Sequence, residues 1–120
     1  MKYNQKNTPE WYWIRGLHDA KIISAIINES DWNPINENLM LKMNCHGAMY
    51  EQDIDEISFY DIKFLTEGFD ETLLNGSWWI ADELTENDDM YVLKLDFDTA
   101  DCIRETVQFT FKRAKVSRNK

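Results

Sequence analysis

The stretch WYWIRGLHDAKIISAII, residues 11–27, decides how the chain begins its fold. Three aromatic residues are followed by Gly16, then by a His18–Asp19 pair, and then by four isoleucines within six residues. Just before it, Thr8-Pro9-Glu10 has the order of a helix start: a capping threonine, a proline in the first turn and an acid. We therefore predict a short N-terminal helix that ends near Gly16, where a glycine can take a positive φ.

Residues 20–29 fit two secondary structures. Ala20, Ile23 and Ile27 would form a stripe on a helix, whereas the four isoleucines favour a strand. Isoleucine is branched at Cβ, and such side chains are stiff in helices and pack well in sheets. The prediction is a strand over residues 20–29.

Alternation of apolar and polar residues predicts further strands. Apolar residues recur at every second position in five segments: Leu39–Cys45, Ile57–Leu65, Ser77–Leu84, Met90–Phe97 and Arg104–Lys112. The rows expected to face inward include Leu39, Leu41, Met43 and Cys45; Tyr60, Ile62 and Phe64; Tyr91, Leu93, Leu95 and Phe97; and Val107, Phe109 and Phe111. The linker TENDD between residues 84 and 90 has the length of a hairpin loop, and one helical turn at Asp70–Leu74, closed by Gly76, is expected before this hairpin.

The predicted fold class is α+β, mainly antiparallel β, with five or six strands and the short N-terminal helix. A helix of two turns cannot cover the apolar face of so wide a sheet. The sheet must therefore curl strongly into a partial barrel, fold onto itself or meet a second copy of the chain. We expect one domain over residues 1–120, with flexible ends at residues 1–7 and 115–120.

The charges are unevenly distributed along the chain. Residues 51–105 carry 17 acidic and three basic side chains, whereas residues 112–120 carry five basic side chains and no acidic one. An acidic body repels phosphate backbones, so nucleic acid is not an expected partner. The basic end is expected to be a frayed, solubilising terminus.

The compartment follows from what the chain does not contain. The start, MKYNQKNTPE, has no apolar signal segment, and no apolar run approaches the length that spans a membrane. Cys45 and Cys102 are too few for a disulfide framework, so we expect two free thiols in a cytoplasmic protein without a membrane partner.

The polar residues match no known catalytic or metal-binding pattern. His18, Cys45, His46 and Cys102 have no zinc-ligand spacing, and the acidic runs at residues 51–55 and 96–101 lack the glycine and glutamate of a calcium loop. Since adjacent side chains point apart on a strand or a helix, His18 and Asp19 are not expected to form a dyad. We predict no catalytic residue, metal or cofactor, and favour binding over catalysis.

The tryptophans point to a surface for a partner. Strand alternation places Trp78 and Trp79 on opposite faces, and we expect Trp79 on the outer one; Trp32 lies in a polar loop. Exposed tryptophan is a common anchor of protein interfaces. With the acids of the hairpin loop, the predicted contact is made by Trp79, Glu86, Asp88, Asp89 and Trp32.

The LHDAKIISA segment, residues 17–25, followed by Leu39-Met40-Leu41-Lys42-Met43, resembles small bacterial β-rich domains. In these, a His-Asp-Ala step leads into an antiparallel sheet, and some are similar to immunity proteins that neutralise toxins of polymorphic toxin systems. The resemblance implies a cytosolic protein that works by binding and transfers no catalytic residue.

Two functions are therefore expected. The first is an acidic module that docks a basic protein partner and is immunity-like. The alternative is a small-ligand or enzymatic domain with a pocket near His18, Asp19 and the tryptophans.

Overall fold

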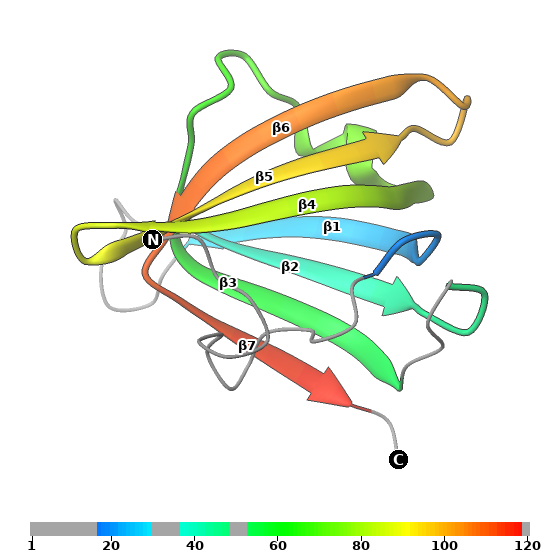
Figure 1. The fold of residues 1–120 in the computed structure, drawn as a ribbon, viewed down its shortest axis with the longest axis horizontal. Coiled ribbons are helices and arrows are strands. Elements are labelled where there is room, and N and C mark those ends of the chain that lie inside the picture. The colour runs from blue at the N-terminus through cyan, green and yellow to red at the C-terminus, as the bar shows by residue number, and fades with distance from the viewer. Residues whose placement is uncertain (1–16, 30–36, 49–52, 119–120) are drawn as a thin grey trace.

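The computed structural model describes residues 17–29, 37–48 and 53–118. These ranges contain seven strands and one 3-10 helix (Figure 1). In chain order they are β1 (Lys21–Glu29), β2 (Glu37–Asn44), β3 (Ile54–Phe64), η1 (Glu71–Leu74), β4 (Ser77–Asn87), β5 (Met90–Asp98), β6 (Arg104–Phe111) and β7 (Arg113–Arg118).

Six of these strands close into a ring. The hydrogen-bonded order is β2-β1-β4-β5-β6-β3-β7, and an additional pairing of β2 with β3 joins the two sides. All pairings are antiparallel. The antiparallel sheet and its curled form are thus as predicted, and the ring buries its own apolar face.

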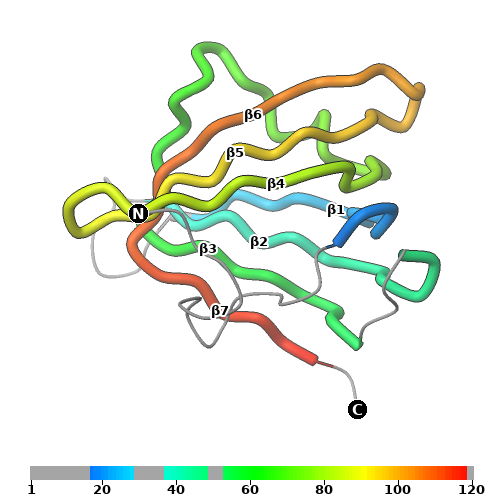
Figure 2. Tube along the Cα trace, viewed as in Figure 1, coloured from blue at the N-terminus to red at the C-terminus, as the bar shows by residue number. Residues whose placement is uncertain are grey.

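Two runs of three consecutive strands make up the ring, and in Figures 1 and 2 the strands lie side by side in the order β6, β5, β4, β1, β2, β3 and β7. β1, β2 and β3 form the first, and β4, β5 and β6 form the second. The β1–β4 ladder that joins them has only two residue pairs, Lys21↔Trp78 and Ile22↔Ser77. On the other side β6 and β7 together run along β3, from Phe109↔Phe64 to Arg118↔Ile54.

Aromatic rings fill the interior of the ring. The ring of Phe59 packs edge-on against Phe109 and Phe111, with centroid distances of 5.1 and 4.9 Å. Trp79 and Phe97 are also fully buried. Burial of such large apolar side chains is the main force that holds a fold of this size together.

The alternation correctly predicted most of the strands. The strand predicted over residues 20–29 is β1, Lys21–Glu29. The helical turn predicted at Asp70–Leu74 is η1, capped by the Asp70 carboxylate, which accepts a hydrogen bond from the Thr72 amide. The inward rows of β2 and β6 are buried as predicted, as are Leu93, Leu95 and Phe97 on β5. Each of these strands carries its inward residues at every second position, without an interruption in that row.

The strand count and the C-terminal region were predicted wrongly. The described residues form seven strands instead of five or six, because residues 113–118, expected to belong to a frayed end, form β7 on the edge of β3. Ala114 and Val116 pack against the core from this strand, while Arg113 and Lys115 are exposed. The predicted N-terminal helix lies outside the described residues.

The row of residues predicted to face inward on β3 was also partly wrong. In β3 the buried ring is that of Phe59, and Tyr60 is only partly buried. Asp61 has a φ of 56° and forms an irregularity at which the register with β2 shifts. The extra residue moves Ile62 back to the inner face, so the strict alternation assumed from the sequence does not hold across it.

Candidate functional site

The predicted acidic residues do meet at the hairpin tip. β4 and β5 pair up to Asn87↔Met90, which leaves Asp88 and Asp89 as the two loop residues, and both are exposed. Asp88 supplies the positive φ, 56°, that so tight a loop requires. Glu86 precedes this loop on β4 and is partly buried.

The predicted anchor is not at this tip. Trp79 lies near the opposite end of β4 and has no exposed surface, and its Nε1 donates a hydrogen bond of 2.8 Å to the Asp82 carboxylate. The exposure predicted for Trp79 is therefore wrong. Trp32 lies outside the described residues.

A bulge in β4 explains the error. Trp79 pairs with Phe97 and Ala81 pairs with Asp96, so Ile80 is an extra residue that has no pairing partner on β5. Trp79 and Leu84 can consequently both face inward although five positions separate them. The tryptophan that faces outward is Trp78, which is 39% exposed.

Trp78 belongs to an apolar surface. Among the described residues six large hydrophobic side chains are exposed, and four of them lie on β1, η1 and the start of β4. These four are Ile23, Ile26, Leu73 and Trp78, which we call the β1 face. The elements adjoin: Lys21 of β1 pairs with Trp78, and the amide of Ala25 donates to Asn75 Oδ1 just after η1.

A second bulge creates part of the β1 face. The register between β1 and β2 shifts between Ile22 and Ser24, so Ile23 is displaced from the ladder. Ile22 and Ala25 are buried, while Ile23 and Ile26 are exposed. The sequence held a signal for this: four isoleucines at positions 22, 23, 26 and 27 cannot all lie on one face of a strand.

His18 and Asp19, expected to point apart, lie close together. His18 Nε2 is 3.5 Å from the Asp19 carboxylate, and its Nδ1 donates a hydrogen bond of 2.7 Å to the carbonyl of Ile80. The two residues are in a turn rather than in a regular strand or helix, and Asp19 has a φ of 69°. This left-handed backbone turns its carboxylate toward the preceding imidazole.

Beside this turn is a shallow pocket of about 190 Å³. It is lined by Asp19, Lys21, Asn44, His46, Gly47 and Trp78. The Lys21 ammonium lies 5.1 Å from the centre of the Trp78 ring, within the range of a cation–π interaction. Of the two residues predicted to form the alternative pocket, Asp19 lines this one and His18 does not, and the tryptophan in its lining is Trp78.

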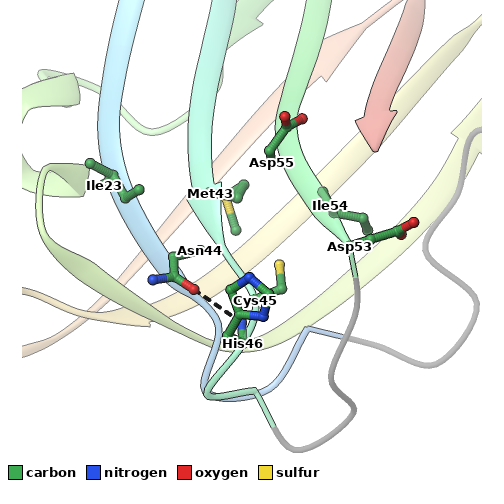
Figure 3. A pocket seen from close by; sticks show the side chains of 8 residues that line it. All are labelled: Ile23, Met43, Asn44, Cys45, His46, Asp53, Ile54 and Asp55. Carbon is green, nitrogen blue, oxygen red and sulfur yellow. Dashed lines mark hydrogen bonds between the residues drawn. The ribbon is translucent and has the colours of Figure 1, made fainter. Parts of the chain in front are cut away.

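A second pocket, of about 250 Å³, adjoins the first and shares Asn44 and His46 with it (Figure 3). It lies where the β2–β3 ladder has ended at Lys42↔Glu56, between the last residues of β2 and the first of β3. The other lining residues are Ile23, Met43, Cys45, Asp53, Ile54 and Asp55. Asp53 forms an ion pair of 2.8 Å with Arg118 of β7.

A family model described as "Protein of unknown function (DUF4085)" matches residues 7–110. The chain belongs to the DUF4085 family. No curated protein and no solved structure matches the chain. The matched range ends within β6, so β7 lies beyond it.

The cysteines of the DUF4085 chain are free, as predicted. Cys45 is buried, and this burial raises the pKa of its thiol to about 11. Cys102 is exposed in the turn between β5 and β6. A thiol with a raised pKa is a poor nucleophile at neutral pH.

Two findings bear on metals and membranes. In the described ranges, no three or more His, Cys, Asp or Glu residues are grouped so that they could hold a metal ion. The acids at residues 96–98 instead pair across the sheet, Asp96 with Thr106 and Asp98 with Arg104. Nor do these ranges contain a helix long and apolar enough to cross a membrane.

Proposed function

We propose that this DUF4085 protein is a cytosolic, acidic protein-binding module that docks a partner through the β1 face. An immunity-like role, in which docking neutralises a toxin, is the form implied by the resemblance of its LHDAKIISA segment. The proposal moves the contact from the hairpin tip, which lacks its tryptophan anchor, to the surface around Trp78.

The β1 face is the observation that carries the proposal. Ile23, Ile26, Leu73 and Trp78 are each between 39% and 49% exposed. Isolated apolar side chains on a surface need no explanation, but several on adjoining elements typically mark a site of interaction. Trp78 has the properties of an anchor, since a large, partly buried ring contributes much contact area at a small entropic cost.

The charge of the chain favours a basic partner. Its net charge is −9, and Asp19, Asp70 and Glu71 lie on the turn before β1 and around η1, beside the β1 face. Acids around an apolar centre attract a basic protein from a distance and then allow apolar contact. The filled interior of the ring supports a surface interaction over the enclosure of a ligand between the sheets.

Position-specific cross-linking tests the location. A photoreactive phenylalanine analogue replaces Ile26 in one variant and Ile103 in another, since Ile103 is equally apolar and exposed but lies in the β5–β6 turn. The expected result is one discrete protein adduct from position 26 in native cytosol and none from position 103. The same adduct from both positions, or no adduct from position 26, would contradict the proposal.

Binding kinetics with the cross-linked partner test the mechanism. Trp78→Ala and Ile26→Ser should mainly speed dissociation, and the tryptophan change should cost about 2 kcal/mol or more of binding free energy. Asp70→Asn with Glu71→Gln should mainly slow association and reduce its dependence on salt. Leu65→Ser, an equally exposed position on another part of the surface, is the control and should leave both rates unchanged.

A second candidate function is a small-ligand site, which the 3.5 Å approach of His18 to Asp19 favours. The adjoining pocket offers a carboxylate, an imidazole, an amide and an aromatic face. His18→Gln and Asn44→Ala separate the two functions, because the first proposal expects partner binding to persist in both. Loss of function in these variants, with no effect from Ile26→Ser, would favour the ligand site.

A further inference from the structure

We infer that the outer edge of β7 is a second docking site, which accepts an extended acidic segment of a partner protein as an added strand. This site is separate from the β1 face and does not depend on it.

Within the part of the chain that the structure describes, β7 is paired along one edge only. β7 pairs with β3 through Arg113↔Tyr60 to Arg118↔Ile54, and it is the last strand in the sheet order. β5, which pairs with β6 up to Tyr91↔Phe111, begins at Met90 and so does not extend along β7. Among the described residues, no strand pairs with the second edge of β7. Alternate backbone amides and carbonyls of an edge strand point away from the sheet, where another strand can bind them.

The side chains of β7 favour an acidic strand. Arg113 and Lys115 are exposed, and Lys112 precedes them. Of the cations on β7, Arg118 is held by Asp53 and the Arg113 guanidinium lies 4.3 Å from the centre of the Tyr60 ring. The cation–π contact keeps the charge of Arg113, so that Arg113 and Lys115 can both attract a carboxylate.

The same cations act against pairing with a second copy. Two β7 edges brought together would bring the exposed Arg113 and Lys115 of one copy close to the same cations of the other. Lysine and arginine on edge strands are a common protection against self-pairing, and they admit only a strand of opposite charge.

The net charge of −9 does not prevent an acidic segment from binding at the edge of β7. At physiological ionic strength, charges more than about 8 Å away are largely screened. Of the nearby acids at the start of β3, Asp53 is paired with Arg118, and the exposed cations at this edge are Arg113, Lys115 and the preceding Lys112. The inner side of the strand carries Ala114 and Val116, both partly buried against the core. The matching segment should therefore alternate acidic residues with small or β-branched apolar ones.

Three synthetic peptides of seven residues test the proposal on the full chain. The first alternates Glu with Val, the second replaces each Glu by Gln, and the third keeps the Glu–Val sequence but carries N-methyl groups on the backbone amides of one edge. We expect the Glu–Val peptide to bind and to protect amides within residues 113–118 from hydrogen exchange. The Gln–Val and N-methylated peptides should bind at least about tenfold more weakly, because each lacks one of the two interactions.

Variants complete the test. Arg113→Glu with Lys115→Glu should reduce binding of the Glu–Val peptide by at least about tenfold. Lys94→Glu is the matched control, an exposed lysine on β5 away from this edge, and should not change it. Ile26→Ser on the β1 face should also leave peptide binding unchanged, so failure here is distinct from failure of the proposed function.

The inference is overturned if the N-methylated peptide binds as tightly as its parent, since the attraction would then be electrostatic alone. Protection of amides elsewhere, absence of binding by the Glu–Val peptide, or a dimer of the chain that pairs through β7 would overturn it as well.

Discussion

Two adjacent tryptophans have opposite surroundings. Trp79 is fully buried and its indole N–H is satisfied by Asp82, whereas Trp78 is 39% exposed and lies beside Lys21. Neighbouring residues on a strand face opposite sides, so exactly one of the two belongs to the core. Which of them it is depends on the bulge at Ile80, and this decides which ring is available to a partner.

The two tryptophans should therefore differ strongly in their contribution to stability. Trp79→Ala leaves a large cavity and should lower the free energy of unfolding by about 3–5 kcal/mol. Trp78→Ala loses a partly exposed ring and a cation–π contact and should cost about 1 kcal/mol or less. Urea denaturation of both variants measures the difference; equal losses would show that the assigned faces are wrong.

Cys45 should make stability depend on pH in the alkaline range. Its pKa is raised from 9.0 to about 11 in the folded chain, because burial disfavours the thiolate. The unfolded chain thus loses this proton first, so stability is fully present below pH 9 and falls between pH 9 and 11. For one thiol the slope approaches about 1.4 kcal/mol per pH unit.

Replacing Cys45 by Ala should remove the contribution of this thiol to the fall in unfolding free energy with pH. Denaturation at pH 8 to 11 measures it. Cys102→Ala is the control and should keep it, since Cys102 is exposed. In the native chain Cys102 should react with a thiol reagent at neutral pH and Cys45 should not. Rapid reaction of both thiols would contradict the burial of Cys45.

At the scale of elements, irregular positions within strands determine which side chains meet. Register shifts occur in β1 near Ile23, in β3 near Asp61 and in β4 near Ile80. Each shift moves the following residues to the other face. Bulges are common where a sheet bends into a barrel, because they increase the local twist.

Asp61 allows a sharp test of one bulge. With a φ of 56°, it lies in the left-handed region, and its amide donates to Asn38 Oδ1. Asp61→Gly should change stability by no more than about 0.5 kcal/mol, whereas Asp61→Val should destabilise by about 1–2 kcal/mol.

Lys63, two residues later on the same strand, is the matched control because its φ is negative. Here the order should reverse: Lys63→Gly should destabilise by about 0.5–1 kcal/mol and Lys63→Val should be neutral or better. Thermal unfolding of the four variants gives the ranking, and the same ranking at both positions would rule out the bulge.

These irregularities also mark the limit of prediction from the sequence. Uninterrupted alternation correctly placed β2, β5 and β6 and the acids of the hairpin tip, because it reports burial directly. Trp79 and Tyr60 were assigned to the wrong face because one inserted residue leaves no clear signal in composition. The approach of His18 to Asp19 depends on a left-handed turn residue, and β7 was missed because its two inward residues are outnumbered by cations.

At the scale of the molecule, the ring is closed unevenly. β6 and β7 follow β3 over most of its length, whereas β1 and β4 share two ladder pairs. That short seam is extended by hydrogen bonds from the Asp19 amide to Trp79 and from the Trp79 amide to Ala20, and by His18. The β1 face lies along this seam.

The seam should open more easily than the sheets. Native-state hydrogen exchange should give the amides of Asp19 and Trp79 an opening free energy at least about 1 kcal/mol below that of Leu93 and Leu95. The latter lie in β5, which has a ladder on both sides. Equal values would mean that the ring opens only when the whole chain unfolds.

The arrangement of the ring as two runs of three consecutive strands also bears on how the chain reaches its native state. Contacts within each run join neighbours in the sequence, so the entropic cost of closing their loops is small and each can form early. The pairing of Arg118 with Ile54 links distant parts of the chain, and β7 leaves the ribosome after the other six strands. We therefore expect the β1–β4 seam to be absent from the folding transition state. A conservative substitution at Ser77, which pairs with Ile22 across this seam and is not part of the β4–β5 ladder, should then change the unfolding rate and leave the folding rate nearly untouched.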